Sequence, residues 1–440
     1  MSELLPSREA MQIREALTDY LTTTFALSDA DAQRSLREFL TDPDSGIFRG
    51  PFVRARIPFR AADDGWCDSL DWYEGHTPYG HQAEAFRRLS SSNLGEQPDG
   101  STKSHPLPTL VVTGTGSGKT EAFLYPILDH VLRAKAAGVD GVKALILYPM
   151  NALANDQARR IAEMIRGFDA LKGVRAALYT GDQGGSKRTR VTAEGLINHR
   201  ETIRDDPPDI LLTNYKMLDQ VLLRPTDRSV VEAMAQGLQY LVLDEFHTYD
   251  GAQGTDVAML LRRLGLALGR SRGDDRPVPE EFADFPLGDV TPVATSATLG
   301  DDGDPSGMLT FAETVFGRPF TADSVVKETR QSTRLWIQNA RAAGRIPTVA
   351  AAGINNALAA TIADAEIAEG ATSTEIAAIV LDRLYPTDPE ATDDTFDWVG
   401  LADEDLLASV AAHPLVHAIA QAAEKAISID DLAEIGRAHV

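Results

Sequence analysis

The feature that most constrains this 440-residue chain is a glycine-rich turn between an apolar run and a helical run. Residues 110–112 are apolar, residues 113–120 read Thr-Gly-Thr-Gly-Ser-Gly-Lys-Thr, and a helical pattern starts at Glu121. Glycines allow successive backbone N–H groups to face an anion, and the N-terminus of the next helix adds positive potential. The turn predicts a phosphate-binding loop in which Lys119 reaches the β- and γ-phosphates and Thr120 holds Mg²⁺. A chance glycine-rich turn is the alternative, which the flanking strand and helix disfavour.

Short apolar runs alternate with longer helical stretches from about residue 107 to residue 320, which predicts an α/β fold. The runs are residues 110–112, 144–148, 176–179, 210–212, 240–243 and 293–295. Continuous apolar runs of this kind are typical of a mostly parallel sheet buried on both faces, with helices as crossovers. Residues 331–440 instead show helical periodicity in a segment rich in Ala, Ile, Asp and Glu.

We therefore predict a helical N-terminal accessory region (1–70), an α/β domain (71–320) and an acidic helical insertion or linker (321–433). The last seven residues, 434–440, can be encoded by DNA that contains the start of a widely used sequencing adapter, and we interpret them as a possible artefact. An ordinary helix end with a glycine cap is the alternative.

The charge of the chain is unevenly distributed. The net charge is −23, but residues 361–440 carry −14 of it, which leaves −9 for the other 360 residues. A locally basic stretch holds Lys187, Arg188, Arg190, Arg200 and Arg204, which we interpret as a solvated loop when taken alone. The single cysteine, Cys67, excludes a disulfide or a cysteine zinc cluster within the chain. Without a long apolar stretch or a secretory signal, we expect a cytoplasmic protein without membrane contact.

A second candidate site follows the apolar run 240–243, where Asp244 and Glu245 stand at the end of a buried strand. Two adjacent carboxylates in this place are unfavourable unless a cation lies beside them. We expect Asp244 to bind Mg²⁺, Glu245 to orient and deprotonate a water, and His247 to connect the site to neighbouring elements. The alternative is a cap for the next helix, which the phosphate loop upstream disfavours.

With both sites in place, the chain resembles the superfamily 2 helicases of the DExH branch, most of all the large bacterial Lhr-like and YprA-like group. An ordered series of motifs between about residues 77 and 320 carries the resemblance, and it covers the N-terminal part with the first RecA-like lobe only. The motifs are residues 77–82, 113–120, 148–157, 180–182, 212–215 with 217–218, 244–247 and 296–298. Residues 247–254 resemble the loop that follows the motif at residues 244–247 in YprA-like enzymes rather than in DEAD-box proteins.

The resemblance implies a RecA-like P-loop NTPase lobe that uses ATP and Mg²⁺. It implies that Gln82 reads the adenine edge while Tyr79 stacks on it. The nucleotide site would comprise Tyr79, Gln82, Thr113, Gly114, Thr115, Gly116, Ser117, Gly118, Lys119 and Thr120. The catalytic residues would be Lys119, Asp244, Glu245 and His247, with Thr120 and Asp244 as metal ligands.

Nucleic acid is the partner that the resemblance implies, with DNA expected rather than RNA. Residues at strand ends near the phosphate loop could grip the nucleic-acid backbone without reading sequence. They are Pro149, Asn151, Gln157, Thr180, Gly181, Thr213 and Asn214. Ser296 and Thr298 would couple the nucleotide state to this grip; the alternative is that both only satisfy backbone groups at a strand end.

The function implied is that of an ATP-dependent helicase or translocase, with a role in DNA repair or phage defence. Residues 321–440 show no strand-rich second lobe and no arginine-bearing motif, so a second RecA-like lobe is expected as a missing partner. Because an arginine finger accelerates hydrolysis by about 10³–10⁵, we expect the chain alone to bind ATP but to hydrolyse it weakly. The alternatives are a single-lobe nucleotide-gated switch or scaffold without motor activity, and a P-loop ATPase that acts on protein.

Overall fold

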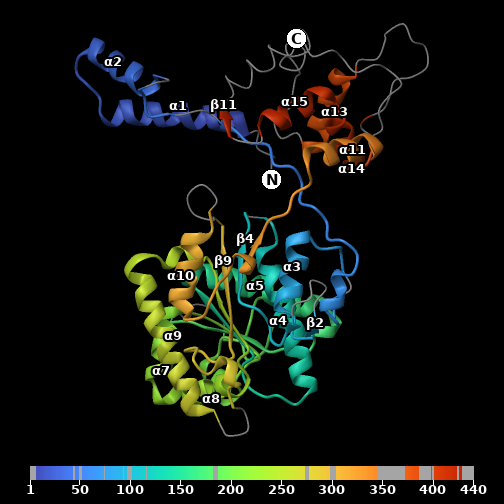
Figure 1. Cartoon of the computed structure of the whole chain (residues 1–440). Coiled ribbons are helices and arrows are strands. Elements are labelled where there is room, and N and C mark those ends of the chain that lie inside the picture. Colours follow the sequence, from blue (N-terminus) through green and yellow to red (C-terminus); the bar gives the residue numbers. More distant parts are fainter. Residues whose placement is uncertain are drawn as a thin grey trace. The chain divides into compact units, whose positions relative to one another are not determined.

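The computed structural model describes residues 6–42, 45–48, 52–73, 75–92, 94–96, 102–114, 116–181, 187–272, 277–297, 304–343, 372–385, 398, 401–423 and 426–428 (Figure 1). The predicted site residues Thr115 and Thr298 lie outside these ranges, as do residues 434–440 and part of the predicted insertion. Contacts within the chain divide it into two compact units, one made of Met1–Pro58 with Arg330–Val440 and the other of Phe59–Thr329. The domain boundaries expected from the sequence stay predictions.

Seven parallel strands form the sheet of the unit Phe59–Thr329, which confirms the predicted α/β fold. All six predicted strands are present, and a seventh, β10, follows residue 320, where the sequence pattern weakens. In spatial order the strands are β10 (Val325–Lys327), β4 (Thr109–Val112), β9 (Thr291–Ser296), β8 (Tyr240–Leu243), β5 (Ala144–Tyr148), β7 (Ile210–Asn214) and β6 (Ala176–Tyr179).

Helices cover both faces of this sheet, as Figure 1 shows. One face carries α3 (Gly80–Leu89), α4 (Lys119–Ala136) and α5 (Asn151–Gly167). The other carries α7 (Tyr215–Leu223), α8 (Arg228–Gly237), α9 (Gly251–Ser271) and α10 (Ser306–Phe316). The unit also contains α6 (Arg200–Asp205), the pair β2 (Gly95–Glu96) and β3 (Thr102–Lys103), and 3₁₀ turns at Trp66–Ser69, Asp169–Leu171, Pro225–Asp227, Phe246–Tyr249, Glu280–Phe282 and Ala322–Ser324.

The alternation of side chains along each strand explains why the strands are continuously apolar. In β5, Leu145 and Leu147 join the core cluster of α7 to α10, whereas Ile146 and Tyr148 join the cluster of α4 and α5. Successive side chains of a strand point to opposite faces, and here both faces are covered. Every residue of β4, β5, β6, β8 and β9 is buried.

The described part of the other unit is mostly helical. It contains α1 (Pro6–Thr24), α2 (Ala30–Thr41), α11 (Thr333–Ala343), α13 (Ser373–Leu384), α14 (Asp403–Ala411) and α15 (Pro414–Ala422), and its two short strands β1 (Phe52–Val53) and β11 (Ile427–Ser428) pair antiparallel. A small apolar cluster joins α13 and α14 around Leu381 and Leu406. None of the helices that the structure describes combines the length and apolarity needed to span a membrane.

A buried ion-pair network ties three strands together at the amino edge of the sheet. The Asp209 carboxylate lies 2.9 Å from Lys143 Nζ and 2.9 Å from Lys135 Nζ, and it accepts the backbone N–H of Arg175 at 2.9 Å. Lys143 and Asp209 are only 3% and 6% exposed at their side chains, so each depends on the other for compensation of its charge. The network anchors the starts of β5, β6 and β7 together.

We expect Asp209→Ala to destabilise the chain strongly, because it leaves the Lys143 ammonium buried without its counter-charge. Loss of one partner of a buried pair costs about 3–5 kcal/mol in unfolding free energy, which a urea titration measures. Asp205→Ala is the matched control: Asp205 is exposed, and its loss should change the free energy by less than about 0.5 kcal/mol. Equal effects of the two substitutions would contradict a stabilising role for the network.

Candidate nucleotide and nucleic-acid site

The predicted phosphate loop lies between β4 and α4, at the carboxyl edge of the sheet. Gly116 and Gly118 both have φ of +76°, a left-handed conformation that other residues adopt only with strain. The Ser117 hydroxyl donates to Thr113 Oγ1 at 2.7 Å, and the Thr113 N–H donates to the carbonyl of Ser296 at 3.2 Å. These contacts hold the described part of the loop in the shape that directs backbone N–H groups toward an anion.

The start of α3 supports the loop from one side. His81 Nε2 donates to the carbonyl of Ser117 at 2.8 Å, and Gln82 Nε2 donates to the carbonyl of Gly118 at 3.1 Å. Gln82 Oε1 also accepts the N–H of Tyr79 at 2.8 Å. The Tyr79 ring is partly exposed and packs against Phe59, with a centroid distance of 4.8 Å. Sequence reasoning assigned Gln82 and Tyr79 to adenine; the structure places the Gln82 amide against the loop.

The two adjacent carboxylates follow β8, next to the end of β9. The Thr295 hydroxyl donates to Asp244 Oδ1 and accepts the N–H of Glu245 at 3.2 Å. Burial raises the pKa of the Asp244 carboxyl above its ordinary value. Glu245 has φ of +49°, and it is the one non-glycine residue with a positive φ in the described part of the chain. Strain of this kind is typical of functional positions.

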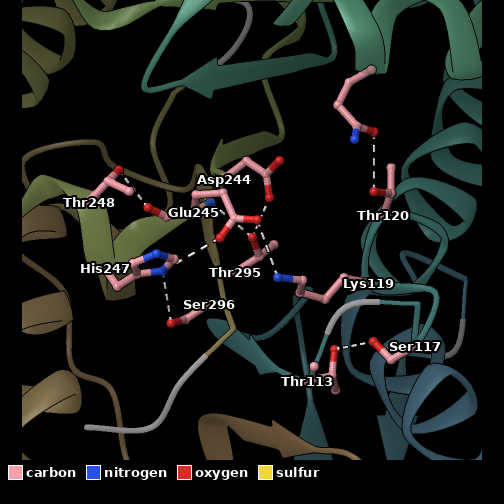
Figure 2. Close-up of polar contacts among 12 residues, drawn as sticks. Thr113, Ser117, Lys119, Thr120, Asp244, Glu245, His247, Thr248, Thr295 and Ser296 are labelled. Carbon is pink, nitrogen blue, oxygen red and sulfur yellow. Dashed lines mark hydrogen bonds and ion pairs between the residues drawn. The ribbon is translucent and has the colours of Figure 1, made fainter. Parts of the chain in front are cut away.

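Figure 2 shows that the phosphate loop and the carboxylates face one another. Lys119 Nζ lies 3.3 Å from Glu245 Oε1, and the side chains are 12% and 27% exposed. His247 Nδ1 lies 3.5 Å from Glu245 Oε2 and 3.3 Å from the Ser296 hydroxyl. The structure therefore brings Lys119, Glu245, His247 and Ser296 into one connected group.

The oxygen ligands at this edge suit a hard divalent cation. Mg²⁺ in nucleotide sites is held by one or two carboxylates, a hydroxyl and the phosphates rather than by a cage of protein ligands. Asp244 supplies a carboxylate, and Thr120 supplies a hydroxyl that is 3.3 Å from Gln157 Oε1. Among the described residues no group of three or more His, Cys, Asp or Glu could form such a cage.

The residues predicted to contact nucleic acid follow the neighbouring strands β5, β6 and β7. Asn214, at the end of β7, caps α7 by accepting the Met217 N–H at 2.7 Å, and its amide donates to Asn151 Oδ1 at 2.5 Å. Pro149 is half-buried directly after β5. Gln157 is buried and lies against Thr120, so its side chain belongs to the phosphate-loop side of the site.

The end of β6 is held by residues that sequence reasoning treated differently. The Thr213 hydroxyl is buried and donates to the carbonyl of Tyr179 at 2.5 Å, which leaves it a positioning role. Arg200 donates to the carbonyls of Thr180 and Gly181 at 2.9 and 3.2 Å. The interpretation of the basic stretch as a solvated loop was therefore wrong for Arg200, which lies on α6 and holds Thr180 and Gly181, the two residues directly after β6.

Thr295 is the functional candidate that sequence reasoning missed. The sequence pattern placed it in the strand run 293–295 and predicted no role for it. The pairing of β8 with β9 places Leu243 beside Ala294, so the next residues, Asp244 and Thr295, come side by side. The available signal was only a hydroxyl at the end of a predicted strand, because the sequence does not show that β9 lies next to β8.

Comparison with known proteins gives the family. The DEAD/DEAH box helicase model matches residues 82–302, which is half of the chain. The chain belongs to the DEAD/DEAH box helicase family. This confirms the resemblance to superfamily 2 helicases and implies ATP as the nucleotide. It does not favour the single-lobe switch.

Two curated relatives are much longer than this chain. The Druantia protein DruE of Escherichia coli is 28% identical over 356 residues, covering 59% of this chain and 18% of DruE. The ATP-dependent helicase YprA of Bacillus subtilis is 30% identical over 267 residues, covering 58% of this chain and 29% of YprA. The chain thus spans less than a third of the length of either relative. The crystal structure of the DUF1998 helicase MrfA bound to DNA aligns at 22% identity with a TM-score of 0.41, over 64% of this chain and 32% of MrfA.

The two left-handed glycines allow a matched test of the loop geometry. A Cβ at Gly118 would lie 2.1 Å from Gln82 Nε2, whereas a Cβ at Gly116 would have no neighbour within 4 Å. We expect Gly116→Ala to cost about 1–2 kcal/mol of backbone strain. Gly118→Ala should cost about 1–2 kcal/mol more, because Gln82 must also give up its two hydrogen bonds.

Unfolding free energies from urea titration measure this difference. Addition of Gln82→Ala should then be less harmful in the Gly118→Ala background than in the wild-type chain, since the contact is already lost. Equal losses for Gly116→Ala and Gly118→Ala would show that Gln82 does not support the loop.

Proposed function

We propose that this chain contains the first ATP-binding lobe of an ATP-dependent nucleic-acid helicase or translocase, with DNA as the substrate. The observation that carries the proposal is the approach of Lys119 to Glu245 at 3.3 Å, which joins the phosphate loop to the carboxylate pair in one site. Family membership supports the ATP-dependent activity. The choice of DNA rests on the resemblance to the Lhr-like and YprA-like helicases.

In this proposal the nucleotide phosphates lie in the loop 113–120, where they replace the Glu245 carboxylate as the partner of Lys119. Thr120 and Asp244 would hold Mg²⁺, which would neutralise charge that develops on the transferring phosphoryl group. Glu245 then orients the attacking water and accepts its proton. His247 lies between Glu245 and Ser296. In this place it positions the Glu245 carboxylate and couples a change at Glu245 to the end of β9. Tyr79 and Gln82 border the nucleotide on the α3 side.

The remaining parts of the proposal concern the whole protein. Residues 71–320 would form the lobe, 1–70 an accessory region and 321–433 an acidic helical insertion, in a cytoplasmic protein. A second RecA-like lobe would supply the arginine that stabilises the transferring phosphate, so the chain alone would hydrolyse ATP slowly and would not unwind DNA. The strand-end residues after β5, β6 and β7 would hold the phosphate backbone of one DNA strand.

We expect Lys119→Ala and Glu245→Gln to separate ATP binding from hydrolysis. Lys119→Ala should weaken the binding of Mg²⁺·ATP by about tenfold or more, because it removes a charge-assisted contact. Glu245→Gln should bind ATP at least as tightly as the wild-type chain, since the carboxylate that competes for Lys119 loses its charge, but it should slow a single turnover by about 10²–10⁴-fold. Calorimetric titration and single-turnover hydrolysis with labelled ATP measure the two effects.

The control for both variants is Glu313→Gln on α10, which changes an exposed carboxylate away from the carboxyl edge. It should leave binding and turnover unchanged. Undiminished turnover in Glu245→Gln would remove the proposed water-activating role. Absence of ATP binding by the wild-type chain would overturn the proposed function itself.

For the nucleic-acid contact we expect Asn214→Asp to weaken the binding of single-stranded DNA by about tenfold, because a carboxylate would face the phosphate backbone. The aspartate keeps the acceptor that caps α7 at the Met217 N–H, so the fold should be retained. Gln220→Glu on the exposed side of the same helix adds an equal charge and should leave the affinity within twofold (about 0.4 kcal/mol). Fluorescence anisotropy with a labelled oligonucleotide measures both, and equal affinities of the two variants would contradict the contact.

A further inference from the structure

A carboxylate outside the proposed catalytic set also contacts the phosphate loop. The N–H of Gly114 donates to Glu328 Oε2 at 3.1 Å. Glu328 directly follows β10, and the pairing of Lys327 with Val112 places the ends of β10 and β4 side by side. The contact therefore follows from the sheet register, because the residues after both strands emerge at the same edge.

This contact places a negative charge where the loop should receive one from a ligand. Backbone N–H groups of such a loop form an anion-binding concavity, and Gly114 is among them. Lys119, the cation of the same loop, is engaged by Glu245 at 3.3 Å. Two carboxylates of the protein thus engage two groups of the loop, the Gly114 N–H and the Lys119 ammonium. Of these two carboxylates, only that of Glu245 has a role in the proposed hydrolysis.

A series of hydrogen bonds also leads from Thr329, the neighbour of Glu328, back to the phosphate loop. The carbonyl of Thr329 accepts the N–H of Arg60 at 2.9 Å, and the carbonyl of Arg60 accepts the N–H of Gly80 at 2.9 Å. Gly80 opens α3, whose His81 and Gln82 side chains donate to the loop carbonyls of Ser117 and Gly118. The approach is tight, since a Cβ on Gly80 would lie 2.8 Å from Thr329 Oγ1.

We propose that Glu328 is an internal competitor for the phosphate loop: its carboxylate occupies the Gly114 N–H until a nucleotide phosphate displaces it. The displacement releases Glu328 and Thr329, the residues through which the chain leaves the unit Phe59–Thr329. Glu328 is then a positioning residue that links nucleotide binding to the exit of the chain from this unit. The inference rests on the proposed ATP site at residues 113–120.

The competitor role and a purely supporting role give opposite changes in affinity. Glu328→Gln keeps an oxygen acceptor for the Gly114 N–H and removes the charge. If the carboxylate competes with phosphate, Glu328→Gln and Glu328→Ala both bind a non-hydrolysable ATP analogue with Mg²⁺ more tightly, by about fivefold. If Glu328 only supports the loop, Glu328→Ala binds the analogue more weakly and Glu328→Gln binds it as the wild-type chain does.

Asp323→Asn is the matched control for this titration. Asp323 is an exposed carboxylate just before β10, and its substitution should leave the affinity unchanged. An equal gain in Asp323→Asn and Glu328→Gln would show a general effect of net charge and would overturn the proposal. Failure of the wild-type chain and all variants to bind the analogue would instead refute the proposed ATP site.

Amide hydrogen exchange tests the release of the segment. In the wild-type chain, the analogue should increase exchange at the Arg60 N–H, because the Thr329 carbonyl that accepts it moves with Glu328. In Glu328→Ala this exchange should already be fast, and the analogue should change it by less than twofold (about 0.4 kcal/mol). Protection of the Arg60 N–H by nucleotide in the wild-type chain would overturn the displacement.

Discussion

The parallel register of β4, β9 and β8 is the constraint on which the nucleotide site depends. Val112 of β4 pairs with Ser296 of β9, and Leu243 of β8 pairs with Ala294. The residues that follow these strands therefore emerge together, which brings the phosphate loop, Thr295 and the carboxylates within hydrogen-bonding reach. A slip of one residue would turn every side chain of a strand to the opposite face. Both faces of these strands are packed against other parts of the chain, so close packing of their side chains holds the register, and the register holds the site.

The two edges of the sheet use buried charge in opposite ways. At the amino edge, Asp209 has two lysines and a backbone N–H as partners, so its charge is compensated within the protein. At the carboxyl edge, Asp244 is buried with a threonine hydroxyl as donor, and its pKa is raised. Glu245 beside it adopts a strained backbone conformation. A buried carboxylate and a strained backbone both lower the free energy of unfolding, and proteins retain them where function requires them.

The sequence was sufficient for the fold class and for the positions of six strands, because a strand buried on both faces has an apolar residue at every position. It also indicated the phosphate loop with Lys119 and the carboxylate pair of Asp244 and Glu245. A glycine-rich turn after a buried strand, and paired carboxylates in the same place, have few purely structural uses. The sequence could not show Thr295 beside Asp244 or Glu328 beside Gly114, because both contacts depend on which strands are neighbours. The weak β-strand pattern of Val325–Lys327 concealed β10, and with it the position of Glu328. Thr213 and Gln157 match the expected motifs by residue type, yet their side chains bond inward, which only packing decides.

Three carboxylates and one lysine meet at the phosphate loop, and this balance determines how a nucleotide can bind. Glu245 contacts Lys119, Glu328 contacts the Gly114 N–H, and Asp244 directly precedes Glu245. Nucleotide phosphates would add charge of the same sign as these carboxylates. Under the proposed function, binding would therefore be an exchange, in which phosphate oxygens take the places of carboxylate oxygens on Lys119 and on the Gly114 N–H. The exchange would need added positive charge, which a divalent cation held by Thr120 and Asp244 would supply. Nucleotide without its metal should then be repelled by the groups that the metal-bound nucleotide displaces or engages. The carboxylates that engage the loop within the protein would thus make nucleotide binding depend on the complete Mg²⁺–nucleotide complex.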